Sequence, residues 1–140
     1  MSEGAAVRGI LLAHGGMARG MTDAIRKIAG VGEEVLIPIS NEGKSPEALQ
    51  AELDDLLGAS PGIVFTDMAH GSCAVTARIC CREERTQAVL FGVNLPVLLD
   101  FVFHRHLPLH ELVPRLLEKG QASLRSVPEY SDNAHRTLPS

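Results

Sequence analysis

His14 is the residue of this chain whose type and setting best suit chemistry. It follows the apolar run Gly9-Ile10-Leu11-Leu12-Ala13, which has the length of a buried strand, and Gly15 and Gly16 come directly after it. A neutral imidazole is a nucleophile and a base near neutral pH. Glycines carry no Cβ, so backbone can approach such a ring closely. A histidine that only packs at a strand end gives the same pattern, and the pattern alone favours neither role.

A second set of polar residues follows a later apolar run. Asp67 comes directly after Ile63-Val64-Phe65-Thr66, and Gly71-Ser72 opens a stretch of helical pattern. We predict that Asp67 lies at the same sheet edge as His14, where a carboxylate would orient the ring and raise its basicity. The free N–H groups of a helix that begins near Ser72 would receive a phosphate or another anion. A serine there is also a routine helix cap, and the two roles are compatible.

Apolar runs of strand length alternate with helical periodicity along the chain. The expected strands cover residues 7–13, 35–39, 63–66 and 88–92, and helical patterns lie between them. Ser45-Pro46 fits a helix start, and Gly30 and Gly58 fit helix ends. A last helix is expected from the leucines at 109–117, with Pro114 near its start. These elements predict an α/β fold: an open, mainly parallel sheet of about four strands with helices on both faces.

The 140 residues are long enough for one domain, which we assign to residues 1–124. From Gln121 onward the chain is polar and rich in Ser and Pro. The first part of this stretch is able to pair as a C-terminal edge strand. Residues 125–140 are expected to form a flexible tail.

Composition excludes several classes of protein. The net charge of −4 and the low aromatic content of 4% argue against a nucleic-acid partner. No apolar run is long enough to cross a bilayer, and the N-terminus has no signal-peptide pattern. The cysteines are odd in number, which favours reduced thiols in a cytoplasmic protein; they are Cys73, Cys80 and Cys81.

The sequence also contains residues typical of two other kinds of site. Gly43-Lys44-Ser45 resembles the end of a P-loop, but Pro38 stands where that motif needs its first glycine, so nucleotide binding there is rejected. A metal site remains an alternative for a group of residues that the fold would bring together, although their spacing matches no compact zinc pattern. That group is His14, Asp67, His70 and Cys73.

Three motifs in order give the chain a family resemblance. They are Gly9-Ile10-Leu11-Leu12-Ala13-His14-Gly15-Gly16, the run Ile63 to Asp67 followed by Gly71-Ser72, and Gly92-Val93-Asn94-Leu95-Pro96. Together they resemble the enzyme IIA component of the mannose family of the bacterial sugar phosphotransferase system, over residues 7–124. The opening motif is also similar to N-acetylgalactosamine-type members.

The resemblance implies a phosphoryl carrier that needs no cofactor and no metal. His14 would accept a phosphoryl group from the phosphocarrier protein HPr and pass it to an enzyme IIB partner. Asp67 and Ser72 would be catalytic with it, and further residues would bind the phosphoryl group or the partner: Gly15, Gly16, His70, Gly71 and Asn94. The family also implies a homodimer with an exchanged C-terminal strand. The protein would be cytoplasmic and would reach the inner membrane through its partners, IIB and the membrane components IIC and IID.

The chain departs from the family pattern beside the second motif. His70 replaces a glycine, Cys73 a proline and Val75 an asparagine. These changes keep two alternatives open. One is a non-catalytic regulator that binds partners through the face around His14, and the other is a metal-dependent enzyme that uses the four residues named above.

Overall fold

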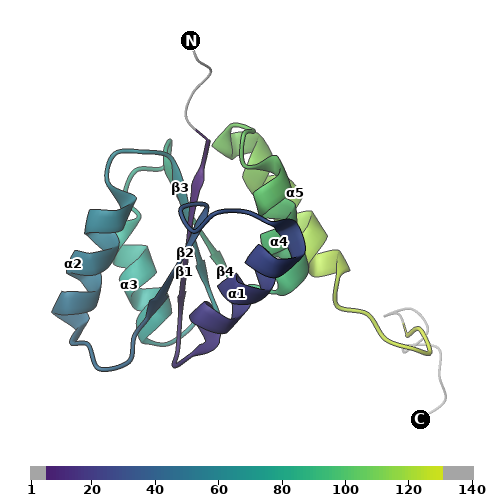
Figure 1. Cartoon of the computed structure of the whole chain (residues 1–140), viewed down its shortest axis with the longest axis horizontal. Helices are drawn as coiled ribbons and strands as arrows, with labels where there is room; N and C mark the ends of the chain where they lie inside the picture. Colours follow the sequence, from purple (N-terminus) through teal and green to yellow (C-terminus); the bar gives the residue numbers. More distant parts are fainter. Residues whose placement is uncertain (1–5, 131–140) are drawn as a thin grey trace.

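The computed structural model describes residues 6–130. In chain order the elements alternate strand and helix until two helices close the series (Figure 1). They are β1 (Arg8–Ala13), α1 (Met17–Ala29), β2 (Leu36–Ser40), α2 (Pro46–Leu57), β3 (Gly62–Thr66), α3 (Ser72–Cys80), β4 (Gln87–Phe91), α4 (Leu95–His104) and α5 (Leu109–Ala122).

The four strands form one parallel sheet in the order β2-β1-β3-β4. The chain first moves from β1 to β2 on one side and then crosses to β3 on the other. The carboxyl ends of β1 and β3 therefore flank the point where the winding direction reverses. In open α/β sheets this point is the usual place for a ligand crevice.

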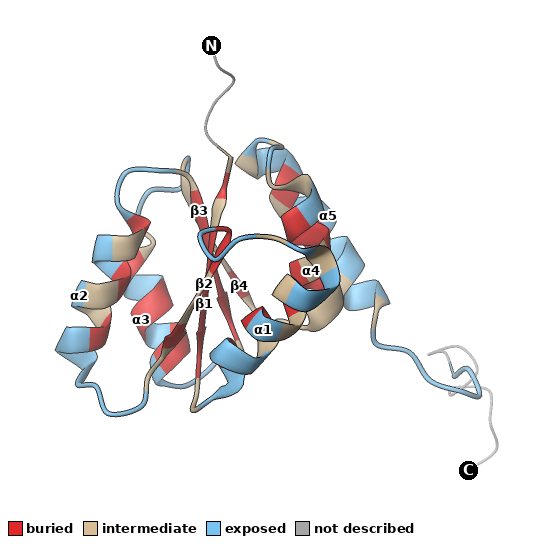
Figure 2. Ribbon diagram, in the orientation of Figure 1, coloured by how far each residue is buried: buried red, intermediate tan, exposed pale blue. Residues whose placement is uncertain are grey.

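Helices cover both faces of the sheet, as predicted (Figure 1). α2 and α3 lie on one face, and α1, α4 and α5 lie on the other. Alternate residues of β1 serve the two layers, because successive side chains of a strand point to opposite faces. Ile10 and Leu12 pack in the α2/α3 layer, whereas Leu11 and Ala13 pack in the layer of α1, α4 and α5. The buried residues accordingly follow the strands and the inner sides of the helices (Figure 2).

Local signals in the sequence place most helix ends correctly. The Ser45 side chain accepts a hydrogen bond of 3.1 Å from the Ala48 N–H and so caps α2. Gly30 ends α1 with a left-handed φ of 70°. Pro114 does not mark the start of the last helix, since α5 begins at Leu109 and carries this proline inside it. Pro114 is exposed and faces away from the core, so α5 keeps its apolar contacts through Leu112 and Leu116.

The expected C-terminal edge strand is absent from the described part of the chain. Gln121 and Ala122 form the end of α5, and residues 123–130 contain no strand. Residues 131–140 of the expected tail lie outside the described residues. Within residues 6–130, no helix combines the length and apolar character that a membrane span requires.

Candidate functional site

The sheet register brings three strand ends together. Leu12 pairs with Thr66, and Ala13 pairs with Ser40. The next residue along each of these strands therefore emerges at the same edge. These residues are His14 after β1, Asn41 after β2 and Asp67 after β3.

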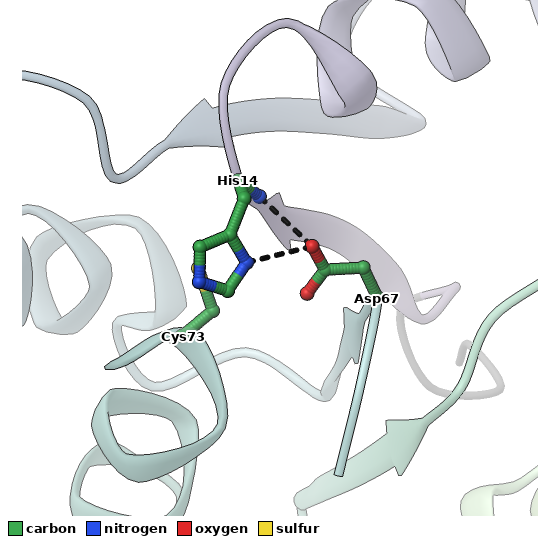
Figure 3. A group of neighbouring side chains, drawn as sticks. All are labelled: His14, Asp67 and Cys73. Carbon is green, nitrogen blue, oxygen red and sulfur yellow. Dashed lines mark hydrogen bonds and ion pairs between the residues drawn. The ribbon is translucent and has the colours of Figure 1, made fainter. Parts of the chain in front are cut away.

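Asp67 holds His14 through two hydrogen bonds to one carboxylate oxygen (Figure 3). Asp67 Oδ2 lies 2.8 Å from His14 Nδ1 and accepts a 3.0 Å hydrogen bond from the His14 backbone N–H. The other oxygen, Oδ1, accepts a 3.0 Å bond from the Met68 N–H. The carboxylate is thus fixed by backbone, and it fixes both the main chain and the ring of His14.

The electrostatics favour a single ring tautomer. Burial raises the pKa of the Asp67 carboxyl, but the hydrogen bonds from the His14 backbone and ring outweigh burial and lower that pKa below its usual value. An ionised carboxylate accepts hydrogen bonds and donates none. The proton of a neutral ring therefore lies on Nδ1, and the lone pair of Nε2 points away from Asp67. The His14 side chain is 38% exposed, so an incoming group can reach it.

The N-terminus of α3 lies against the same ring. Gly71 precedes this helix with a φ of 96°, a conformation that favours glycine. A Cβ placed on Gly71 would meet His14 Cε1 at 3.4 Å and His14 Nε2 at 3.5 Å, which is ordinary van der Waals contact, so the residue before α3 lies close to the ring. No side chain caps α3. The N–H groups of its first turn, which begins at Ser72, therefore have neither a helical acceptor nor a cap.

Asn41 belongs to the site although the sequence did not single it out. Its Oδ1 accepts a 3.3 Å hydrogen bond from the Gly15 N–H, and its Nδ2 donates a 3.3 Å bond to Ser72 Oγ. It thereby joins the loop after His14 to the start of α3. The available signal was the position of Asn41 at the end of a strand next to β1.

Cys73 lies beside the His14–Asp67 pair (Figure 3). One ligand atom each of His14, Asp67 and Cys73 lies within 4.8 Å of the others. Cys73 is fully buried, and burial with help from the nearby Asp67 charge raises the pKa of its thiol to about 11. His70, the fourth residue of the metal alternative, is exposed on the loop before α3 and is not part of this group among the described residues.

The remaining candidate residues lie at two places. Gly15 and Gly16 border an open hollow of about 570 Å³ next to His14, which Arg19 and Lys44 also line. Asn94 follows β4 and caps α4 by accepting a 3.0 Å bond from the Val97 N–H. Its amide also donates to the Gly120 carbonyl at 3.2 Å. Both ends of the Asn94 side chain thus serve the packing of α4 and α5.

Comparison with known proteins identifies the family that has this fold. The fold and site define an α/β protein with a histidine, held by a carboxylate, at the switch point of its parallel sheet. A family model described as the PTS system fructose IIA component, EIIA-man, matches residues 9–116. The chain therefore belongs to the EIIA-man family, the mannose-family IIA components of the sugar phosphotransferase system. The resemblance found in the sequence is confirmed, and the family is one of phosphoryl carriers in sugar transport.

Solved structures show the same fold at low sequence identity. The phosphotransferase system component EIIA from Streptococcus agalactiae aligns with a TM-score of 0.80 and 22% identity, covering 87% of this chain and 98% of that one. The mannose/sorbose-specific IIA subunit from Enterococcus faecalis aligns at 0.77 and 20%, covering 91% and 100%. The IIA protein associated with the fucose utilization operon of Streptococcus pneumoniae aligns at 0.69 and 23%, covering 90% and 97%. No curated protein sequence matches the chain.

Proposed function

We propose that His14 accepts a phosphoryl group from phosphorylated HPr and transfers it to an enzyme IIB partner. The observation that carries this proposal is the 2.8 Å contact between His14 Nδ1 and Asp67 Oδ2, which leaves the lone pair of Nε2 free on a side chain that is 38% exposed. A nucleophile for phosphoryl transfer needs that free lone pair and a fixed direction. Family membership supplies the reaction class.

The transfer requires only groups that the chain and its partner hold. His14 Nε2 attacks the phosphorus of the donor phosphohistidine in line, one N–P bond forms as the donor's N–P bond breaks, and the electron pair returns to the donor imidazole. The Nδ1 proton stays between the ring and Asp67, which stabilises the positive charge that develops on the ring. The phosphoramidate on His14 stays reactive, so the reverse chemistry passes the group to IIB.

We assign the stabilisation of the phosphoryl oxygens to the start of α3. This helix has no side-chain cap, and Gly71 before it lies close to the His14 ring, which supports a role for its first-turn N–H groups and the Ser72 hydroxyl. Hydrogen-bond donors fixed before the reaction are among the strongest contributors to such transfers. His70, exposed on the loop before α3, is placed to meet the partner protein, as are Gly15 and Gly16 beside the hollow.

Phosphorylation of the full chain tests this assignment. Incubation with enzyme I, HPr and phosphoenolpyruvate is expected to add one acid-labile phosphoryl group, detected by intact mass. His14→Ala should abolish it, whereas His70→Ala should leave the group in place and change only the rate. An unmodified wild-type chain in the presence of phosphorylated HPr would contradict the carrier function. Partner binding that persists in His14→Ala without phosphorylation would instead favour the regulatory alternative.

We also infer that the chain acts as a homodimer in the cytoplasm and reaches the membrane components IIC and IID only through IIB. Two features support the dimer. β4 is an edge strand of the sheet with one side unpaired in the described chain, and unpaired edges favour pairing with another chain. The segment after α5 presents Leu124 and Val127 at 90% and 100% exposure, and a second copy would cover them.

A further inference from the structure

The thiol of Cys73 gives the site a property that phosphoryl transfer does not use. An imidazole, a carboxylate and a thiol converge from three elements: the end of β1, the end of β3 and the first turn of α3. Mg²⁺ and Ca²⁺ prefer oxygen ligands, whereas a set of one nitrogen, one oxygen and one sulfur suits Zn²⁺. The combination therefore points to a cation of the zinc class.

We propose that His14, Asp67 and Cys73 bind Zn²⁺ and that the bound ion blocks phosphoryl acceptance by His14. The part of this proposal that concerns phosphoryl transfer rests on the proposed function. The binding of the ion does not.

The distances fit such a site after a small contraction. The three ligand atoms lie within 4.8 Å of one another. Ligands at zinc distances of about 2.0–2.3 Å stand roughly 3.3–3.8 Å apart in a tetrahedron. The site therefore has to close by at most about an ångström. The ion replaces the hydrogen bond between His14 Nδ1 and Asp67 that otherwise fixes the ring, so the partly exposed ring can then turn toward it. Because the His14 side chain is 38% exposed, water can take the fourth position of the ion.

The charges around Cys73 also suit a cation. In the absence of an ion, burial and the Asp67 carboxylate hold the thiol in its protonated form. A divalent cation reverses both effects, because it offsets the carboxylate and favours the thiolate. Binding therefore forms a Zn–S bond and releases one proton to solvent. The affinity for zinc should rise with pH.

Zinc and a phosphoryl group compete for the same imidazole electrons. A neutral imidazole has one N–H and one lone pair. Zinc on Nε2 occupies the attacking lone pair directly, and zinc on Nδ1 drives the ring proton to Nε2. In either arrangement Nε2 cannot attack phosphorus. Zinc bound at this site therefore acts as an inhibitor of the carrier.

Binding can be measured with Co²⁺ as a spectroscopic substitute for zinc. The full-length wild-type chain should show a thiolate-to-cobalt absorption band in the near ultraviolet at one equivalent of Co²⁺. Cys73→Ala and Cys73→Val, the second of which keeps the buried volume, should lose the band. Cys80→Ala and Cys81→Ala are the matched controls and should keep it. Absence of the band in the wild type, or its persistence in both folded Cys73 variants, would overturn the proposal.

Inhibition is measured with isolated phosphorylated HPr as donor, which removes enzyme I and its magnesium from the assay. One equivalent of Zn²⁺ should slow phosphorylation of the wild type at least tenfold, and a zinc-selective chelator should restore it. Each Cys73 variant, compared with its own zinc-free rate, should lose most of this inhibition. Equal inhibition of wild type and variants would overturn the proposal. A wild type that accepts no phosphoryl group without zinc would refute the proposed function, while the cobalt band would still decide metal binding.

Discussion

At the scale of single residues, one carboxylate does most of the positioning. Asp67 Oδ2 binds both the backbone N–H and the Nδ1 of His14, so it fixes where the ring lies and which nitrogen carries the proton. A ring held only by packing could rotate or exchange tautomers. Asp67 removes both freedoms before a partner arrives.

Asp67→Asn tests this positioning role. The amide keeps the size of the side chain but has no negative charge and can donate a hydrogen bond to Nδ1, which favours the tautomer with its proton on Nε2. We expect the rate of phosphoryl acceptance to fall on the order of 10²-fold or more, as when a carboxylate that sets a catalytic imidazole's tautomer is lost. Stopped-flow mixing with phosphorylated HPr measures the rate, and ¹⁵N NMR of the ring reports the tautomer. An unchanged Nδ1–H tautomer together with an unchanged rate would contradict the role of Asp67.

At the scale of elements, the site depends on how loops after parallel strands are tied together. Asn41 accepts from the Gly15 N–H and donates to Ser72 Oγ, so the ends of β2, β1 and α3 are joined by one side chain. Both bonds are 3.3 Å long, which is near the upper limit of useful geometry. Asn41 therefore acts on the reaction by placing its neighbours.

Asn41→Ala should lower the rate of phosphoryl acceptance on the order of tenfold, because Ser72 and the loop after His14 lose a shared anchor. Asn41→Asp keeps the acceptor for Gly15 but loses the donor to Ser72, so its rate should lie between those of the wild type and Asn41→Ala. Ser45→Ala, which removes the cap of the following helix, controls for a general loss of stability of about 1 kcal/mol. A similar decrease in rate in Ser45→Ala would show that Asn41 has no specific effect.

Gly9 shows how closely a helix packs on the central strand. A Cβ at this position of β1 would lie 2.6 Å from Phe101 Cε2 and 2.9 Å from Leu36 Cδ1. Phe101 belongs to α4 and packs edge-on against Phe65 of β3, with ring centroids 5.2 Å apart. The missing side chain of Gly9 leaves room for this aromatic pair above the sheet.

Gly9→Ala should therefore lower the free energy of unfolding by about 1–3 kcal/mol, because the ring of Phe101 must move in a filled core. Gly20→Ala is the matched control: it lies in α1 with nothing within 4 Å of a Cβ. Alanine there should raise the stability by about 0.5–1 kcal/mol, since glycine is a poor helix former. Urea unfolding followed by circular dichroism measures both changes. The two changes in the free energy of unfolding should have opposite signs. Stabilisation by both variants would contradict the close packing at Gly9.

At the scale of the whole molecule, the segment after α5 presents apolar side chains to solvent in the single chain. Leu124 and Val127 have no cover, and β4 leaves one edge of the sheet unpaired within the described residues. A homodimer formed through these features would be stabilised by burial of this apolar surface. A charged side chain at each of the two positions would then oppose that burial.

The double variant Leu124→Arg, Val127→Arg should accordingly be monomeric where the wild type is dimeric. Ile28→Arg places the same charge on an exposed apolar residue of α1, at 61% exposure, and should leave the dimer intact. Sedimentation equilibrium of the full-length proteins at micromolar concentration measures the mass. A wild type that sediments as a monomer would remove the dimer from the proposed function.

The fold class and the residues proposed for the site were predictable from the sequence alone. Strand-length apolar runs between helical patterns predict the parallel α/β sheet, because burial on both faces requires continuous apolar strands. The Ser45 cap and the glycine end of α1 at Gly30 could also be predicted, because each depends on residues only a few positions apart. His14, Asp67 and Ser72 were found because each follows or opens an element at the carboxyl edge of the sheet.

The contacts among these residues became visible only in the folded chain. The crossing from β2 to β3 on opposite sides of β1 puts Asp67 beside His14, and this depends on strand order, which no local pattern encodes. The same strand order brings Asn41 to the site and places the Cys73 thiol beside the ring. Both ends of the Asn94 side chain, in contrast, bond to residues of α4 and α5. Contacts between residues 26 to 59 positions apart arise from packing of whole elements, so only the assembled sheet shows them.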